Sequence, residues 1–356
     1  MNKRLVTIMV ATGLAGASAG AAPLQVQQVG GDARWVAHLD VERLWAGPFG
    51  GQLKTELATS PAKAKVDAVA MIFGLDPYKD IRGLTVYGQA PGERQGVMLV
   101  NATPLNQERI LTILRAAPDY ASKPYQNTTI HHWTDQRETA KDAAAGDRWG
   151  AFHGTDLIVV GNTEALLEAA LDVLNGQRPA LKAGDRIGGY PVDGAGAILV
   201  AAVAMSVPSP ADTQSPAGAD QRAMILQNVQ GLSLRLVETG TTLELTALLR
   251  AKTPETAAFV EQALKGIQAF GVLSQGKKPA LAQLVQAITI NATGTDVKAQ
   301  LVYGSQELIN CFRTLKPPAQ AEPEADAEMA VTVKVAPVTP TDKTAPAAPP
   351  APVAKP

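Results

Sequence analysis

The chain has 356 residues, of which 46 % are hydrophobic and 18 % charged, and its formal net charge is −1. A chain with this length and hydrophobic content can bury sizeable cores, so a largely disordered protein is excluded. Nucleic acid is also excluded as a partner, because its recognition needs a clustered basic surface and the sequence has no basic cluster.

The first 22 residues have the three parts of a secretory signal peptide. Lys3 and Arg4 supply positive charge, residues 5–14 are mostly apolar, and residues 17–22 are small, with A-x-A frames that end at Ala19 and Ala21. The apolar stretch is shorter than the roughly 20 residues that span a membrane. We therefore expect an exported protein that is periplasmic, cell-surface or secreted, with no integral membrane segment after signal cleavage. No cysteine follows the cleavage region, so we expect no lipoprotein anchor.

Residues 23–190 are predicted to form a first α+β unit. Apolar runs and alternating patterns predict its strands, whereas helical periodicity and N-cap residues predict its helices. The expected strands are 34–40, 84–88, 97–101, 128–134, 149–153 and 157–160, and the expected helices are 41–58, 62–73, 104–117 and 163–175.

Residues 191–316 are predicted to form a second α+β unit by the same criteria. The expected strands are 197–205, 232–237, 243–249, 288–292 and 297–303, and the expected helices are 220–229, 254–270 and 305–316. Cys311 lies in the last of these helices and is the one cysteine of the chain, so no intramolecular disulfide can form. We interpret Cys311 as a small buried apolar residue.

Short turn and helix-start motifs of the first unit recur in the second unit. Four short motifs recur in the same order, each displaced by roughly 140 to 150 positions. The pairs are Gly83-Leu84-Thr85-Val86 with Gly231-Leu232-Ser233-Leu234, Thr103-Pro104 with Thr253-Pro254, Gly154-Thr155-Asp156-Leu157 with Gly294-Thr295-Asp296-Val297, and Gly161-Asn162-Thr163-Glu164 with Gly304-Ser305-Gln306-Glu307. The Gly-Thr-Asp motifs are typical of hairpin turns, and the Thr-Pro motifs are typical of helix starts. The pattern indicates an internal duplication.

Strand patterning indicates the type of sheet. Strands of the second unit alternate between apolar and polar residues, as Leu232 to Leu236 does, which favours an antiparallel sheet with one buried and one wet face. In the first unit, 97–100 and 157–160 are apolar on both faces, so we expect the two units to pack together there. The predicted fold class is α+β: two similar units, each a mainly antiparallel sheet with helices on one face, plus a disordered C-terminal tail.

That tail comprises residues 317–356, which are rich in Pro, Ala and acidic residues and cannot bury enough apolar area to fold. Within it, Val331, Val333 and Val335 alternate with polar residues, which is typical either of a strand that adds to a partner's sheet or of chance in a biased sequence. Residues 208–218 and 139–146 are expected to be flexible loops on the same compositional argument.

The candidate metal ligands are four histidines of the first unit, His38, His131, His132 and His153. All four fall on predicted strands. Because neighbouring strand residues face opposite sides, His131 and His132 cannot both join one site without a bulge. A zinc site needs three or four converging ligands, and no metal-binding spacing accompanies these residues. We expect ordinary half-buried histidines and no metal.

Other candidate motifs are also incomplete. Residues 271–278 match the phosphate loop G-x-x-x-x-G-K, but Lys278 stands where Ser or Thr must bind magnesium. Gly194-Ala195-Gly196 lacks the third glycine of a dinucleotide fingerprint. Two groups of residues could form ligand surfaces. We interpret the first, a set of polar sheet positions, as a solvated face: Arg235, Glu244, Asn291, Lys298 and Gln300. The second comprises Trp35, Trp45, Trp133 and Trp149, of which we interpret Trp35 and Trp133 as core residues. We therefore predict no catalytic, cofactor-binding or metal residue and no cofactor.

The run Ala33-Arg34-Trp35-Val36-Ala37-His38-Leu39-Asp40, together with Gly154-Thr155-Asp156-Leu157-Ile158-Val159-Val160-Gly161, resembles exported proteins of unknown function from planctomycete-type bacteria. The resemblance mainly covers the first unit. It implies a secreted, non-catalytic body and carries over no functional residue.

Three functions are compatible with these observations. The first is an exported, non-catalytic binding or scaffold protein of the cell envelope, whose sheet faces or inter-unit groove contact a protein or envelope component. The second is an envelope hydrolase with a non-standard site in the first unit that includes His131 or His132. The third is a structural wall or coat component anchored by its tail.

Overall fold

The computed structural model describes residues 22–90, 96–117, 119–134, 146–205, 228–274 and 279–315. All of the predicted signal peptide except Ala22, the tail with Val331, Val333 and Val335, the loop 208–218, and nearly all of the loop 139–146 and of the helix 220–229 lie outside these residues. Residues up to 315 form one compact unit.

The first half of the chain contributes seven strands, most of which the sequence analysis located. It begins with a 3-10 turn, η1 (Val26–Gln28). The strands are β1 (Trp35–Asp40), β2 (Ile81–Gly88), β3 (Gly96–Ala102), β4 (Ala121–Tyr125), β5 (Thr128–Thr134), β6 (Asp147–His153) and β7 (Leu157–Gly161), and the helices are α1 (Val41–Ala46), α2 (Pro48–Ala58), α3 (Ala62–Phe73), α4 (Gln107–Arg115) and α6 (Glu164–Leu174).

The second half contributes five long strands and three helices. A two-stranded ribbon, β8 (Arg186–Ile187) and β9 (Tyr190–Pro191), precedes them. The strands are β10 (Leu199–Ala204), β11 (Val229–Thr239), β12 (Thr242–Ala251), β13 (Ile288–Thr293) and β14 (Asp296–Gly304), and the helices are α8 (Pro254–Ser274), α9 (Pro279–Gln286) and α10 (Ser305–Leu315).

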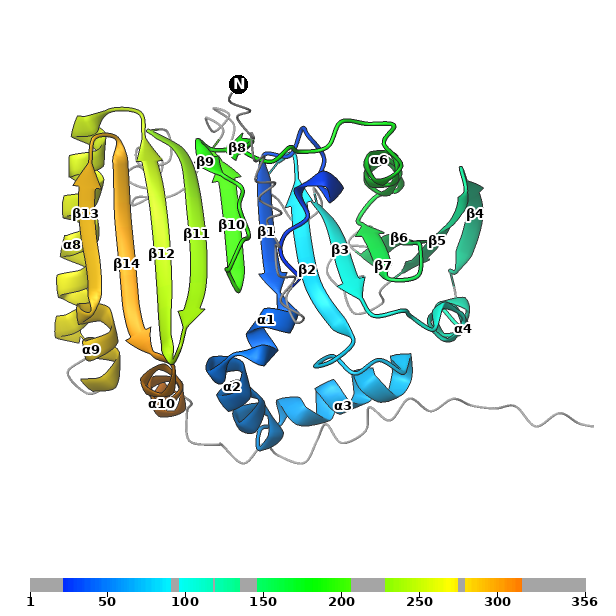
Figure 1. The fold of residues 1–356 in the computed structure, drawn as a ribbon, viewed down its shortest axis with the longest axis horizontal. Helices are drawn as coiled ribbons and strands as arrows, with labels where there is room; N and C mark the ends of the chain where they lie inside the picture. Colours follow the sequence, from blue (N-terminus) through cyan, green and yellow to red (C-terminus); the bar gives the residue numbers. More distant parts are fainter. Residues whose placement is uncertain are drawn as a thin grey trace, which may run out of the picture. The chain divides into compact units, whose positions relative to one another are not determined.

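All twelve long strands form one antiparallel sheet, which confirms the expected fold class. Its order is β13-β14-β12-β11-β10-β1-β2-β3-β7-β6-β5-β4, as Figure 1 shows. Counted outward from the central β1–β10 pair, the first half runs β1-β2-β3-β7-β6 and the second runs β10-β11-β12-β14-β13. The two halves thus share one strand order, and both predicted units contribute to a single continuous sheet.

The repeated motifs that begin with glycine occupy equivalent places in the two halves. Gly154 and Gly294 have φ of 68° and 58° and make the turns before β7 and β14. Only glycine adopts this left-handed conformation without strain. Irregular pairing precedes Gly83 in β2 and Gly231 in β11, so both strands carry a bulge at the same point of the repeat. These matches support the inferred duplication.

Helices cover opposite faces of the sheet in the two halves. The helix α6 packs on β3, β6 and β7, and its Leu167 and Leu171 belong to the same core as Val36 of β1. The helix α8 packs on β12, β13 and β14 through Ala257 and Val260. The cross-strand partners Val297, Leu249, Leu232, Val203 and Trp35 follow one another across the sheet, and they place Trp35 on the same face as α8. We call the two sides the α6 face and the α8 face.

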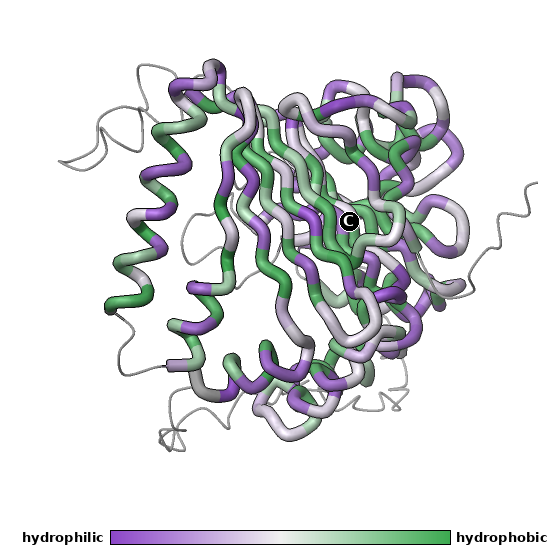
Figure 2. Tube along the Cα trace, turned by 60° about the vertical axis from the view of Figure 1, so that its left-hand side comes forward, coloured by the Kyte–Doolittle hydropathy of each residue, from purple (hydrophilic) through white to green (hydrophobic). Residues whose placement is uncertain are grey.

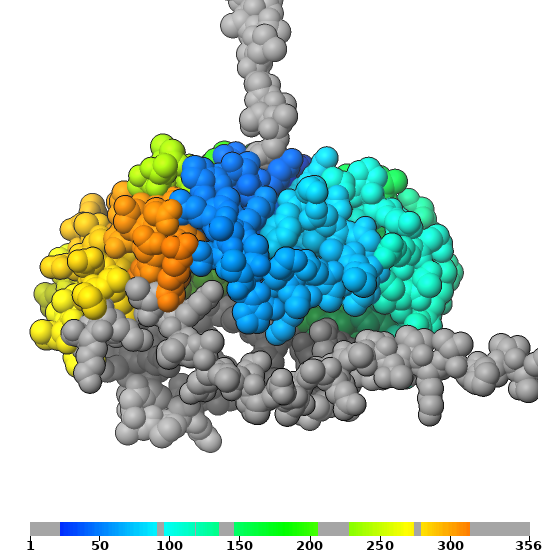
Figure 3. All heavy atoms as spheres, turned by 90° about the horizontal axis from the view of Figure 1, so that it is seen from below, coloured from blue at the N-terminus to red at the C-terminus, as the bar shows by residue number. Residues whose placement is uncertain are grey.

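The helices α1, α2 and α10 cover the α8 face near the C-terminal end of β1. A small core joins Leu44, Trp45 and Phe49 of α1 and α2 to Leu236 and Leu243 of the sheet. Figure 3 shows this end, with α10 in orange beside α1–α3 in blue. An ion pair between Glu56 of α2 and Arg313 of α10 links residues 257 positions apart.

Several local predictions are wrong in detail. The helix predicted at 41–58 is two helices, because Gly47 has an extended conformation and Pro48 starts α2. The helix predicted at 104–117 begins at Gln107 and is capped by Asn106, whereas Thr103 instead bonds to Asp80. The strand β4, the helix α9 and the ribbon β8–β9 were missed. Pro124 inside β4 is tolerated because β4 is an edge strand of the sheet.

The predicted packing of two units over strands 97–100 and 157–160 is also wrong. One face of these strands belongs to the core beneath α6, which includes Leu99 and Val159. The other is the α8 face, where Met98 is 38 % exposed. The halves join edge to edge, by main-chain hydrogen bonds between β1 and β10, because each half offers an unpaired first strand.

Candidate functional site: an apolar groove on the sheet

The candidate site is an open groove on the α8 face at the seam between the two halves. It has a volume of about 550 Å³, which lies within the roughly 300–1,000 Å³ of typical ligand pockets. Its floor lies on β1, β10, β11 and β12, and the side chains that point into it are Trp35, Ala37, Ala201, Val203, Leu232, Leu234 and Ala247.

The floor is hollowed because small residues occupy one row across the strands. Ala37, Ala201, Leu234, Ala247 and Ala299 are successive cross-strand partners, so they lie in one line perpendicular to the strands. Four of these five residues are alanine. The row spans four strand spacings, about 19 Å.

Larger side chains border this alanine row on both sides. One flanking row is Trp35, Val203, Leu232, Leu249 and Val297, and the other is Leu39, Leu199, Leu236, Leu245 and Leu301. The result is a furrow about one side chain wide, which Leu234 interrupts between Ala201 and Ala247.

The helix α8 carries exposed apolar residues on the same face of the sheet, although none of its residues lines the groove. Its Ala257, Val260 and Leu264 pack against the sheet, yet Phe259, Ile267 and Phe270 are 55, 67 and 72 % exposed. Figure 2 shows α8 standing beside the strands, with hydrophobic positions along it.

The exposed apolar flank of α8 does not face the edge of the sheet. Lys265 and Ala269 of α8 lie over the edge strand β13, where they line a separate hollow with Thr289 and Asn291. Ala257, Val260 and Leu264 mark the side of α8 that contacts the sheet. With 3.6 residues per turn, the exposed residues Phe259, Ile267 and Phe270 lie to one side of this contact, and Lys265 and Ala269 lie to the other. The three exposed residues therefore lie on the flank of α8 that is turned away from the edge strand β13.

The groove offers no group for acid–base or nucleophilic chemistry. Of the residues that line it, Ser233 and Trp35 alone carry polar side-chain atoms. Ser233 is the partner of Ala202, on the α6 face, and the Trp35 indole donates to the Ala90 carbonyl at 2.9 Å. The groove can therefore bind apolar surface, and its lining supplies neither a proton donor nor a nucleophile. Trp35 was predicted as core, and it is instead half-buried at one end of this furrow.

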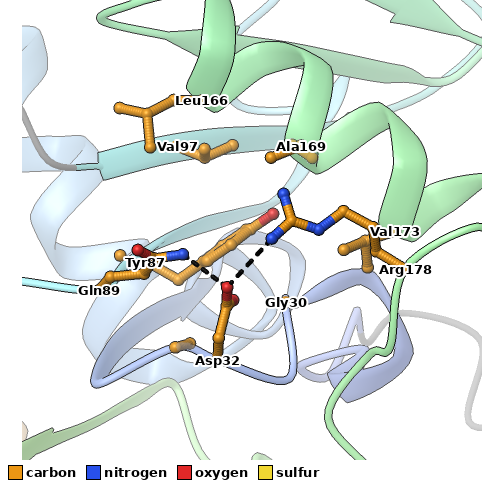
Figure 4. A pocket seen from close by; sticks show the side chains of 12 residues that line it. Gly30, Asp32, Tyr87, Gln89, Val97, Leu166, Ala169, Val173 and Arg178 are labelled. Atoms are coloured by element: carbon orange, nitrogen blue, oxygen red, sulfur yellow. Dashed lines mark hydrogen bonds and ion pairs between the residues drawn. The ribbon is translucent and has the colours of Figure 1, made fainter.

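A second cavity lies under α6 on the other face. It measures about 30 Å³ and is bordered by Gly30, Tyr87, Val97 and Arg178 among others, as Figure 4 shows. Asp32 accepts hydrogen bonds from Gln89 and Arg178 at its rim. Burial and the nearby charge of Asp32 raise the pKa of Tyr87 to about 12. A space of this size fits one water molecule and is too small for a metabolite.

The side chains of the four histidines do not converge on one site. His38 is buried on the α6 face, where it hydrogen-bonds to Thr85. His131 is buried on the α8 face, and its Nδ1 lies 2.8 Å from the Tyr120 hydroxyl. Burial and the charge of Arg115 lower the pKa of His131.

His132 lies on the α6 face, 3.4 Å from Asp147 and against Trp149, and His153 lies 3.3 Å from Asn175. Among the residues that the structure describes, no three His, Cys, Asp or Glu side chains are grouped so as to hold a metal.

The other sequence candidates are dispersed. Gly271 lies inside α8, and residues 275–278 of the phosphate-loop look-alike lie outside the described residues. Gly194 lies against Leu24 in the loop before β10. Cys311 is buried in α10. Trp45 packs on Tyr78, and the Trp133 ring lies over Gly150.

The predicted polar face is present on the α6 side of the second half. Arg235 donates to the carbonyls of Asp193 and Ala195, and Gln300 donates to Glu244. Lys298 and Asn291 are cross-strand partners on the same side. This face is exposed and bonded within itself, whereas the apolar groove was not predicted. Alternation marked one face of β10–β12 as buried, and the sequence had no signal that the helices leave much of that face uncovered.

Comparisons with known proteins give little further information. No protein family and no curated protein matches the chain. Among solved structures, the chain is similar to the Treponema protein TP0453 in two crystal forms. Form III has a TM-score of 0.42 and 9 % identity over 82 % of this chain and 97 % of that one. Form I has a TM-score of 0.39 and 10 % identity over 84 % and 99 %. No helix in the described part of the chain is long and apolar enough to span a membrane.

Proposed function

We propose that this protein is an exported, non-catalytic binding protein of the cell envelope and that its groove holds the hydrocarbon chain of a lipid. The observation that carries the proposal is the alanine furrow, which is apolar, one side chain wide and open to solvent. A narrow linear furrow fits a flexible hydrocarbon chain better than an aromatic ring or a helix, whose diameter with side chains is about 10–12 Å.

The energetic argument is that the groove leaves apolar surface in contact with water. Burial of apolar surface is favourable by about 25 cal/mol per Å². A bound hydrocarbon chain would cover Ala201 and Leu234 on the floor of the groove. Exposed apolar patches of this kind on a soluble body are typical of binding sites. Export rests on the signal-peptide pattern of residues 1–22.

Titration of the processed protein with cis-parinaric acid, a polyene fatty acid whose emission is excited by energy transfer from tryptophan, tests the proposal. We expect saturable binding with energy transfer from Trp35. Ala201→Phe fills the furrow on an open face of the sheet and should weaken binding at least about tenfold, a loss of roughly 1.4 kcal/mol. Thr246→Phe is the matched control, because Thr246 lies on the same part of the sheet but points to the α6 face.

Two results would contradict this function. One is the absence of saturable binding to the wild-type protein, and the other is equal binding by Ala201→Phe and Thr246→Phe. The envelope hydrolase stays a prediction, and incubation of the protein with an ester lipid tests it. Recovery of a lipid that has been shortened or de-esterified during the incubation would favour the hydrolase, whereas recovery of intact lipid would favour a carrier.

A further inference from the structure

Asp40 is a buried carboxylate whose charge is poorly compensated by side chains. It is 0 % exposed at the end of β1. Its Oδ1 caps α1 by accepting from the Arg43 main-chain N–H at 2.8 Å. Its Oδ2 accepts no hydrogen bond, and the nearest cationic atom is the Arg43 Nε at 3.4 Å, on a side chain that is 33 % exposed. A buried carboxylate is costly unless cations and hydrogen bonds compensate its charge, and Asp40 has one partly exposed cationic partner, Arg43.

The main chain of Ala22 is a second partner of the Asp40 Oδ1, and it leaves Oδ2 without a hydrogen bond. Its nitrogen lies 3.1 Å from the Asp40 Oδ1, and its carbonyl accepts from the His38 Nε2 at 2.9 Å. The His38 Nδ1 then accepts from the Thr85 hydroxyl at 2.9 Å, which is the pattern of a neutral imidazole. Burial lowers the pKa of His38, in agreement with this neutral form. Both main-chain polar groups of residue 22 are therefore held by buried side chains.

Two glycines leave room for this segment. A methyl group at Gly83 would lie 3.4 Å from the Ala22 carbonyl and 3.1 Å from His38, and one at Gly194 would lie 2.9 Å from the Leu24 nitrogen. Leu24 itself is buried in the main core. The segment that begins at residue 22 therefore sits in a formed slot.

We propose that this slot is a binding site for the processed N-terminus of the protein. Hydrolysis of the Ala21–Ala22 bond by a signal peptidase adds one water, which leaves a carboxylate on Ala21 and an α-ammonium on Ala22. That ammonium forms a buried ion pair with Asp40 in place of the amide contact. The A-x-A frame that ends at Ala21 creates this group at the observed position. The frame that ends at Ala19 would place the ammonium two residues away, at Gly20.

This inference rests on the export part of the proposed function and is independent of lipid binding. The first experiment expresses the full chain in a Gram-negative host and sequences the N-terminus of the protein in the periplasmic fraction. We expect Ala22 as the first residue. A first residue of Gly20 would overturn the inference and leave export intact, whereas an unprocessed cytoplasmic chain would overturn both.

The second experiment measures the ion pair in a double-mutant cycle. Chains that begin at Ala22 and at Gly20 are compared by thermal unfolding, each with Asp40 and with Asp40→Asn. Asparagine keeps the helix cap and removes the charge. With Asp40, the Ala22 chain should melt higher by roughly 4 °C or more, because only this chain has the buried ammonium.

With Asp40→Asn, the difference between the two chains should disappear. Equal melting temperatures of the two Asp40 chains, or a difference that persists with Asp40→Asn, would show that no such pair forms. Neither of these two experiments measures binding of cis-parinaric acid. Failure of lipid binding would therefore leave their results unaffected.

Discussion

Ala37 of β1 and Ala201 of β10 are direct cross-strand partners at the seam where the two halves of the sheet meet. Both point to the α8 face, and together they form one end of the alanine row. The seam is the place where the duplicated halves join, so a groove there depends on residues from both halves. This position gives the duplication a functional meaning, because neither half alone would contain the furrow.

The exposed flank of α8 is expected to serve binding rather than stability. Replacement of Phe259, Ile267 and Phe270 together by serine should weaken the affinity for cis-parinaric acid at least about tenfold, because a hydrocarbon chain that extends from the groove over β12 would lose apolar contact with this flank. The unfolding free energy should change by no more than about 0.5 kcal/mol per site, because these side chains are mostly exposed.

Val260→Ala is the matched control for α8. Val260 is 3 % exposed against the sheet, so its truncation should cost about 2 kcal/mol of stability in urea unfolding and leave affinity nearly unchanged. The opposite pattern, with stability lost in the serine variant and affinity kept, would mean that the flank is part of the core.

Stability should fall in mild acid because of His38. Burial lowers the folded-state pKa of His38 below the ordinary histidine value of about 6.5, so the unfolded chain binds a proton more readily than the folded one. The stabilisation is complete above about pH 6.5 and is lost as the pH falls from there towards the folded pKa. Urea unfolding midpoints between pH 5 and 8 measure this effect. His38→Gln should flatten that part of the profile, and an unchanged slope in the variant would assign the effect to other groups.

Two glycines should respond in opposite ways to alanine. Gly266 lies in α8 with nothing within 4 Å of an added methyl group, so Gly266→Ala should stabilise the protein by about 0.5–1 kcal/mol. At Gly231 the added methyl would lie 2.3 Å from the Gly188 carbonyl oxygen, so Gly231→Ala should cost roughly 2 kcal/mol or more. Thermal unfolding of both variants measures the contrast, and destabilisation by Gly266→Ala would contradict the packing described for α8.

The Tyr190 hydroxyl should contribute modestly to stability. It donates to the Asp296 Oδ1 at 3.0 Å, while Arg250 binds both oxygens of the same carboxylate at 2.8 and 2.9 Å. Tyr190→Phe removes one hydrogen bond and leaves Asp296 paired, so we expect a loss of about 1 kcal/mol in urea unfolding. A loss above about 3 kcal/mol would mean that the ribbon β8–β9 detaches from the sheet.

Local features of this fold could be predicted from the sequence because they depend on neighbouring residues. Alternation of leucine with polar residues located β11 and β12, and Thr163 and Thr253 were correctly placed as caps of α6 and α8. The recurrence of Gly154-Thr155-Asp156 as Gly294-Thr295-Asp296 indicated the duplication, since both motifs need the same turn. His131 and His132 were correctly placed on opposite faces, because the period of a strand fixes that relation.

The groove and the N-terminal slot were decided by tertiary structure alone. The alanine furrow requires Ala37, Ala201, Ala247 and Ala299 to be in register across strands far apart in the chain, and it requires α8 to leave the seam uncovered. The pairing of β1 with β10 and the choice of face for each helix depend on the global burial of apolar area, which no local pattern encodes. The contact between Ala22 and Asp40 likewise depends on how the first residues return to the end of β1.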